Sequence, residues 1–221
     1  LEKIITIIRE DIKMKTLAQH MLKKFTSNVE TMCHGDLHSG SIMCTDKDTR
    51  VIDPEFAFYG PMGFDLGMLL ANFLMAYFSQ EGHRTHSELS NYKQWILNIM
   101  EDTVKHFQAE FTSLWHSKRT GILYPKTLFE DQGHSSEMAL KGMLDNIWTD
   151  GIGFCGIEMH RRCLSLAHNA DFEMIDDVNL RAKLEARNLL MGRDLILSST
   201  NIDNIGKLIS LARDYNVKEV L

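Results

Sequence analysis

The feature that most constrains the fold of this chain is an apolar run from Leu66 to Phe78, thirteen residues interrupted by Asn72. A helix needs about 20 apolar residues to cross a bilayer, so this run is too short for a membrane span. We therefore expect it to form a buried helix, with the rest of a domain packed around it.

Helical periodicity dominates on both sides of this run. Apolar residues recur at helical spacing through residues 1–25, which we predict to form a single helix. Thr85 to Glu88 has the pattern of a capping box at the start of another helix. On one face that helix carries a stripe of aromatic residues that we assign to the core: Tyr92, Trp95, Phe107 and Phe111. After a loop over residues 117–134, further helices are expected at 135–149, 152–169, 177–198 and 203–215.

Between residues 29 and 55 the pattern changes to short apolar runs separated by polar turns. The runs are Thr31–Cys33, Ile42–Cys44 and Val51–Ile52, and Asp46–Asp48 supplies a turn between the last two. This spacing predicts a β-hairpin. The sequence thus predicts an α+β fold that is predominantly α-helical, with one small β-hairpin region on its N-terminal side.

Composition disfavours several classes of protein. The chain has 221 residues, of which 44% are hydrophobic and 24% charged, as is typical of a globular domain. Its formal net charge is −6, which disfavours a nucleic-acid partner that would need a basic face. Four cysteines without a C-x-x-C pair, together with the lack of a visible signal peptide, predict reduced thiols in a cytoplasmic protein.

The residues best suited to catalysis or metal binding lie in two nearby segments. The first is the polar loop His34–His38, which holds Asp36, and the second is Asp53-Pro54-Glu55, directly after an apolar run. An Asp that accepts the proton of a substrate hydroxyl, beside two carboxylates that hold Mg²⁺ and phosphate oxygens, is an arrangement used in phosphoryl transfer. We expect Asp53 and Glu55 to alternate along an extended segment, with Pro54 fixing φ between them.

Other interpretations of these residues stay open. A single Asp in a loop is most often a turn former, and His34, Asp36 and His38 could instead form the zinc site of a metallohydrolase. The two histidines could also simply brace the loop by hydrogen bonds. Asp65 is expected to cap the helix that follows and to hydrogen-bond the backbone of the loop around Asp36.

Two nucleotide-binding patterns are discounted. Gly151–Gly156 fits G-x-G-x-x-G, but the residues before it are expected to be helical, whereas a dinucleotide-binding fold requires a strand there. We therefore assign these glycines to helix packing. Gly206 and Lys207 are followed by Leu208, where a P-loop requires Ser or Thr.

Taken together, three segments resemble the aminoglycoside-phosphotransferase/choline-kinase-like family, which is related to the protein kinases. They are HGDLHSGSIM from His34, VIDPEFAFYGPMGFDLG from Val51 and GIEMHRRCLSLAHNADFE from Gly156. Ser41 stands where most members have an Asn that binds a second metal ion, and the D-x-E pair replaces D-F-G. In both departures the chain resembles the branch of the family that phosphorylates 5-methylthioribose in methionine salvage.

The resemblance implies a role for each matching residue. Asp36 is implied to be the catalytic residue and to contact the substrate hydroxyl. The segment Asp53-Pro54-Glu55 is implied to bind ATP, with its two carboxylates as the ligands of Mg²⁺. Arg161 and Arg162 are implied to bind the substrate near the sugar and the transferred phosphate, which suits the bidentate guanidinium group.

The resemblance also implies an architecture. Residues 1–221 are similar to the C-terminal lobe of a protein-kinase-like fold, in which a small β-hairpin region carries the catalytic and metal-binding segments. The β-rich N-terminal lobe, with its phosphate-covering loop and Lys, has no counterpart before His34, so we expect only part of the enzyme here.

The implied reaction converts ATP and 5-methylthioribose into ADP and 5-methylthioribose 1-phosphate. It is expected in the cytoplasm, in a homodimer, without nucleic-acid or membrane partners. Two alternatives stay open. One is another small-molecule kinase of the family, acting on choline or an aminoglycoside, and the other is an inactive lobe that acts only by association.

Overall fold

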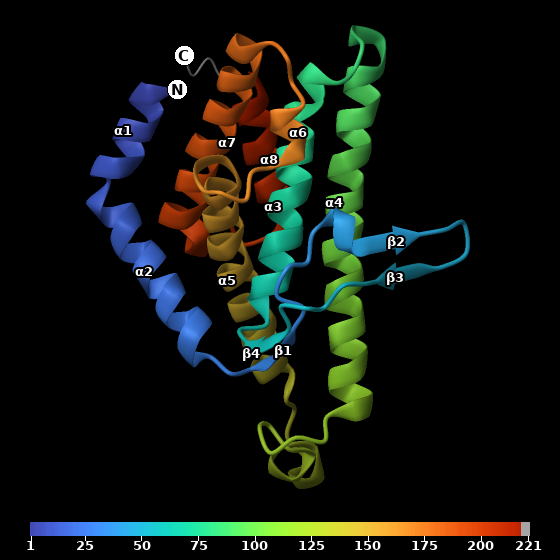
Figure 1. Ribbon diagram of the computed structural model, residues 1–221. Helices are drawn as coiled ribbons and strands as arrows, with labels where there is room; N and C mark the ends of the chain where they lie inside the picture. Colours follow the sequence, from blue (N-terminus) through green and yellow to red (C-terminus); the bar gives the residue numbers. More distant parts are fainter. Residues whose placement is uncertain (218–221) are drawn as a thin grey trace.

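The fold is built almost entirely from helices (Figure 1). The computed structural model describes residues 1–217. Its elements, in chain order, are α1 (Glu2–Glu10), α2 (Ile12–Ser27), β1 (Thr31–Cys33), β2 (Ile42–Cys44), β3 (Thr49–Val51), β4 (Phe58–Gly60), α3 (Gly63–Ser79), α4 (His86–Lys118), α5 (Glu137–Leu164), α6 (Ala170–Glu173), α7 (Val178–Ser198) and α8 (Ile205–Val217). The predominantly helical α+β fold is confirmed. None of the helices in this part of the chain combines the length and the apolar character needed to cross a bilayer.

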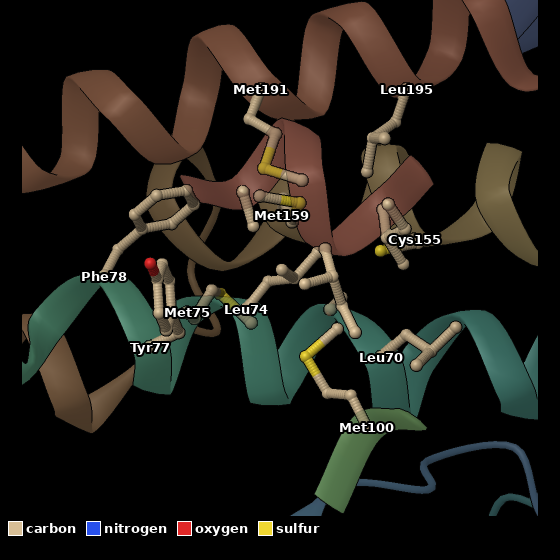
Figure 2. Packing of buried hydrophobic residues seen from close by; sticks show 14 of the residues in the cluster. Leu70, Leu74, Met75, Tyr77, Phe78, Met100, Cys155, Met159, Met191 and Leu195 are labelled. Carbon is tan, nitrogen blue, oxygen red and sulfur yellow. The ribbon is translucent and has the colours of Figure 1, made fainter. Parts of the chain in front are cut away.

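Helix α3 contains the apolar run and packs against α4, α5 and α7. Its side chains Leu70, Leu74 and Phe78 are fully buried, and they belong to the same core as Met159 of α5 and Met191 of α7 (Figure 2). Burying a side chain of this size contributes about 1.5–3 kcal/mol. The predicted buried helix is therefore confirmed as the centre of the core.

Glycines allow three of these helices to approach each other closely. A Cβ added at Gly67 of α3 would lie 2.5 Å from the backbone oxygen of Gly151 in α5, and one at Gly156 would lie 2.5 Å from that of Gly192 in α7. A larger side chain at either position would force the helices apart. The helix-packing role of the G-x-G-x-x-G pattern is thus confirmed, since the pattern lies inside α5 and is preceded by helix.

The single helix predicted over residues 1–25 is wrong, because the chain breaks at Asp11. The Asp11 carboxylate accepts a hydrogen bond from the backbone N–H of Met14 at 2.8 Å and so caps α2. The same carboxylate forms an ion pair with Arg193 of α7. The break lets α1 pack on α7 while α2 packs on both α5 and α7.

Helix α5 is longer than predicted. The pattern predicts separate helices over residues 135–149 and 152–169, but one helix runs through the expected break at Asp150. Asp150 is buried, and its carboxylate pairs with the ammonium group of Lys24 in α2. This polar residue therefore faces a partner inside the protein instead of marking a loop.

Helix α4 begins after Thr85, as predicted, but without a full capping box. The Thr85 hydroxyl donates a hydrogen bond to the Glu88 carboxylate at 2.7 Å, but it does not itself cap a backbone N–H of the first turn. Three of the four aromatic residues assigned to the core pack against it. Trp95 is the exception: it is 53% exposed and lies beside Tyr92 on the flank of the helix.

Two short antiparallel ladders position the polar segments. The predicted hairpin is confirmed as β2 and β3, and it projects from the helical body (Figure 1). Strand β1 pairs with β4, with Cys33 opposite Phe58; this pairing was not predicted, because β4 is only three residues long and directly precedes Pro61. Strand β1 ends directly before the loop His34–His38, and β4 begins shortly after Asp53-Pro54-Glu55. The β1–β4 ladder therefore brings these two polar segments together.

Candidate functional site

The loop His34–His38, which we call the Asp36 loop, is anchored by Asp65 of α3. The Asp65 carboxylate accepts hydrogen bonds from the backbone N–H groups of His34 at 2.5 Å and Gly35 at 3.1 Å. The predicted contact between Asp65 and the loop is therefore confirmed. The predicted N-cap position is wrong, because the helix already begins at Gly63 and Asp65 lies inside its first turn.

Gly35 brings the Asp36 loop against the segment that follows β3. Its φ is +89°, and a Cβ there would lie 2.1 Å from the backbone oxygen of Phe56, so only glycine fits. The ring of His34 adds two contacts: Nε2 lies 2.8 Å from the carbonyl oxygen of Ile52, and Nδ1 accepts a hydrogen bond from the N–H of Asp36 at 3.3 Å. Both ring nitrogens of His34 are thus engaged in bracing the loop.

The carboxylate of Asp36 meets two arginines of α5. Arg162 Nη2 donates to Asp36 Oδ1 at 3.0 Å, and Arg161 Nη2 lies 3.9 Å from the same oxygen. The other oxygen, Oδ2, has His38 Nε2 at 3.5 Å, longer than an ordinary hydrogen bond. The three residues implied to bind substrate therefore lie together, although they come from opposite halves of the chain.

Glu158 joins this cluster and was not predicted from the sequence. Its side chain is only 5% exposed and accepts hydrogen bonds from Arg161 Nε at 2.6 Å, Arg161 Nη2 at 2.9 Å and Arg162 Nε at 2.6 Å. The hydrogen bonds that Arg161 donates to Glu158 are the main reason that the pKa of Arg161 is raised. The signal that could have found Glu158 is its spacing, three and four residues before two arginines on one helix.

Asp53 and Glu55 are placed differently from the prediction. They lie in a turn after β3, with Asp53 at φ +65°, so they do not alternate along an extended segment. Both residues are exposed, and within residues 1–217 neither carboxylate has a hydrogen-bond or ion-pair partner. Unpaired carboxylates are hard oxygen donors, and one or two of them with phosphate oxygens and water form a usual Mg²⁺ site. The residues present therefore fit the ion that the family resemblance implies.

The zinc site considered as an alternative is not formed. In the part of the chain that the structure describes, no three His, Cys, Asp or Glu side chains are grouped so that they could hold a metal ion. Ser41 also has a structural contact: its buried hydroxyl donates a hydrogen bond to the carbonyl oxygen of Asp36 at 3.0 Å, which ties the start of the hairpin to the Asp36 loop.

A pocket of about 910 Å³ opens beside Asp36. Its polar wall is formed by Asp36, Glu158, Arg161 and Arg162. The facing wall is largely aromatic. Its rings pack against one another with centroids 4.7 to 5.4 Å apart, and they belong to Phe25, Phe58, Phe64 and Phe154. This wall was not predicted from the sequence, because its residues come from α2, β4, α3 and α5 and no local pattern relates them.

Comparison with known proteins adds to this geometry. A model of a phosphotransferase enzyme family matches residues 8–93, a stretch that contains the Asp36 loop, both ladders and α3. Methylthioribose kinase 1 of Oryza sativa subsp. japonica is 38% identical over 215 residues, which cover 95% of this chain and 49% of that protein. Over residues 8–93 the chain is therefore similar to the phosphotransferase enzyme family.

Bacterial relatives support the same grouping. The methylthioribose kinase of Escherichia coli O45:K1 is 37% identical over 204 residues, 92% of this chain and 49% of that protein. That of Yersinia pestis (strain Pestoides F) is 34% identical over 206 residues, 93% of this chain and 48% of that protein. The chain thus spans about half the length of the curated relatives that it matches. The arginines of α5 lie outside the family match but inside the region shared with these relatives.

Proposed function

We propose that this chain corresponds to the C-terminal lobe of a kinase that transfers the γ-phosphoryl group of ATP to the anomeric hydroxyl of 5-methylthioribose. The products are ADP and 5-methylthioribose 1-phosphate, in methionine salvage. The observation that carries the proposal is the Asp36 carboxylate at the edge of the pocket, paired through one oxygen with Arg162. The names of the curated relatives support the choice of sugar.

In this proposal Asp36 accepts the proton of the sugar hydroxyl as that oxygen attacks the γ-phosphorus. Its Oδ1 is occupied by Arg162, whereas Oδ2 receives no hydrogen bond from residues 1–217 and can take the proton. The side chain is 29% exposed, so a ligand in the pocket can reach it. As the new O–P bond forms, the bond between the γ-phosphorus and the bridging oxygen of ATP breaks, and ADP leaves.

Arg161 and Arg162 bind the sugar and the phosphoryl group that it receives. Guanidinium groups suit this role because their N–H groups match phosphate oxygens and stay charged at any working pH. Both arginines line the pocket, and the side chain of Arg161 is 40% exposed.

The segment Asp53-Pro54-Glu55 holds the phosphates of ATP together with Mg²⁺. When bound there, the ion supplies positive charge that offsets the negative charge of the phosphate groups. The two carboxylates have no competing protein partner among the described residues, so their oxygens are available as ligands.

The charge of the pocket favours methylthioribose over an aminoglycoside. The two carboxylates of Asp36 and Glu158 are balanced by Arg161 and Arg162, and apart from Gln19 the remaining side chains of the lining are apolar. An aminoglycoside, which carries several ammonium groups, would find no unpaired carboxylate there. An aromatic wall instead suits an apolar methylthio group, because sulfur packs favourably against aromatic rings.

A coupled assay of ADP release, with Mg²⁺·ATP and 5-methylthioribose, tests the proposal. It is run on this 221-residue chain and on a form extended at its N-terminus. Asp36→Asn should lower turnover by about 10²–10⁴-fold with sugar binding retained, because an amide cannot take up the proton. Asp48→Asn, in the exposed turn of the hairpin, is the control and should leave turnover unchanged.

Three other results would contradict the proposal. Normal turnover by folded Asp36→Asn would remove Asp36 from the reaction. Turnover with choline or an aminoglycoside, and not with the sugar, would favour another kinase of the family. Failure of both forms to release ADP would favour a lobe that acts only by association.

A homodimer, carried over from the family resemblance, completes the proposal, together with a cytoplasmic location and the absence of nucleic-acid and membrane partners, which rest on the cysteines, the net charge and the hydropathy of the sequence. The homodimer is tested by light scattering on the purified chain, which should give the molar mass of two chains. A monomer at all concentrations would contradict it.

A further inference from the structure

Glu158 is the most deeply buried charged group at the pocket, and the proposed reaction assigns it no role. Within the described residues it accepts three of the four hydrogen bonds that the two neighbouring guanidiniums make with carboxylates, and Asp36 accepts the fourth. The fork between Arg161 and Glu158 is bidentate, which fixes the direction of the guanidinium as well as its position.

The contacts divide each guanidinium into an inner and an outer edge. Glu158 holds the Nε edge of both Arg161 and Arg162. The Nη1 atom of each arginine has no hydrogen-bond partner within residues 1–217, and both side chains line the pocket. The outer edges are thus available to a ligand, while the inner edges are fixed.

The backbone behind Glu158 holds it in place. A Cβ at Gly156, two residues earlier, would lie 2.5 Å from the backbone oxygen of Gly192, so α5 is packed directly on α7 at this point. The carboxylate therefore projects from a part of the helix that has little room to move.

The balance of charge shows what Glu158 prevents. Two carboxylates face two guanidiniums at present. If Glu158 lost its charge, Asp36 would be the one carboxylate left for both arginines, and guanidinium groups would compete for both of its oxygens. Neither oxygen of Asp36 would then be free for a substrate, and the outer edges of the two guanidiniums would no longer point in a fixed direction.

We propose that Glu158 is a positioning residue, which draws Arg161 and Arg162 away from Asp36 so that one carboxylate oxygen and the outer edges of both guanidiniums face the substrate. This inference rests on the proposed function for its kinetic consequence, but the arrangement itself can be tested without catalysis.

The kinetic test is Glu158→Gln, which keeps the size of the side chain and removes its charge. The expected result is a fall in kcat/KM for 5-methylthioribose of at least about tenfold, with KM for Mg²⁺·ATP changed by less than about twofold. Glu158→Asp keeps the charge and should recover part of the loss. If circular dichroism shows that Glu158→Gln does not fold, the kinetic comparison with wild type is made with Glu158→Asp instead.

Glu185→Gln is the matched control. Glu185 is also a buried glutamate on a long helix, and it accepts a hydrogen bond from Arg181, four residues earlier, at 2.8 Å. It does not line the pocket. A general structural effect of losing a buried Glu–Arg pair would appear in both variants, whereas a positioning effect on kcat/KM appears in Glu158→Gln alone.

An NMR measurement separates failure of this inference from failure of the proposed function. The Nε–H signals of Arg161 and Arg162 are identified in the substrate-free chain by their loss in Arg161→Lys and Arg162→Lys. Their exchange with solvent should become at least about tenfold faster in Glu158→Gln and stay unchanged in Glu185→Gln. If this holds while wild-type protein fails to phosphorylate the sugar, the proposed function is wrong and the arrangement stands. Unchanged exchange in Glu158→Gln, or turnover equal to wild type, overturns the inference.

Discussion

A Cβ atom at Gly35 would stand 2.1 Å from the backbone oxygen of Phe56. The loop that carries Asp36 therefore touches the segment that carries Asp53 and Glu55 backbone against backbone. Because this contact involves no side chain on the Gly35 side, it holds the proposed base next to the proposed Mg²⁺ ligands without filling the space between them.

Gly35→Ala should separate these segments. The positive φ of Gly35 alone costs a non-glycine residue about 1–3 kcal/mol, and the overlap with Phe56 adds to it. Urea titration should show a loss of at least that size, and turnover should fall with it. Gly142→Ala is the control, because a Cβ there meets nothing within 4 Å on the exposed face of α5. That variant should gain about 0.5–1 kcal/mol, and a loss of stability in it would contradict the comparison.

Asp53→Asn should separate charge from backbone conformation. Asn tolerates a positive φ such as the +65° of Asp53, so the turn should keep its shape and thermal unfolding should be unchanged. The Mg²⁺ concentration that gives half-maximal turnover should rise on the order of tenfold, because one anionic oxygen ligand is lost. An unchanged Mg²⁺ requirement would remove Asp53 from the proposed site.

Asp11 should contribute stability that depends on pH. The hydrogen bond from the Met14 N–H, helped by Arg193 and opposed by burial, lowers the pKa of Asp11 below its usual 3.8. A lowered pKa means that the stabilisation is complete above pH 3.8 and is lost as the pH falls through the folded-state value. Asp11→Ala should therefore lose about 1–2 kcal/mol at neutral pH, as expected for a helix cap. Chemical denaturation below pH 3.8 should show a smaller difference from wild type, and a constant difference would contradict this account.

The four cysteines, all free thiols, should differ sharply in reactivity. Burial raises the pKa of Cys33 to about 11 and that of Cys163 to about 12, and it also raises the pKa of Cys155. Cys44 is exposed on the hairpin. Since the thiolate is the reactive form, iodoacetamide near pH 8 should label Cys44 first, with the others at least about tenfold slower. Mass spectrometry counts the labels, and rapid labelling of Cys33 in the native protein would contradict the β1–β4 arrangement.

Local patterns in the sequence predicted the elements that local forces determine. The apolar run gives the buried helix α3, and two apolar runs around a polar turn give the hairpin β2–β3. The errors occur where a tertiary partner decides. Asp11 breaks a helix in contact with α7, and Asp150 continues one because Lys24 neutralises it.

The candidate site shows the same division. The motif around Asp36 could be found from its own residues, whereas the paired arginines were implied by the family resemblance of their segment. The aromatic wall of the pocket could not be found in this way, since its four rings come from separate elements. The turn at Asp53 was missed because a positive φ in a residue before proline is disfavoured by local sterics.

The contact between Asp36 and Arg162 joins positions 126 residues apart. Synthesis of the chain from its N-terminus completes the Asp36 loop, its anchor Asp65 and helix α3 long before the arginines are made. The carboxylate can gain its partners once α5 has been synthesised and has docked on α3. A nascent chain therefore carries every residue of the Asp36 loop and still lacks the pocket beside it, so the proposed activity can begin only after the helical core has closed.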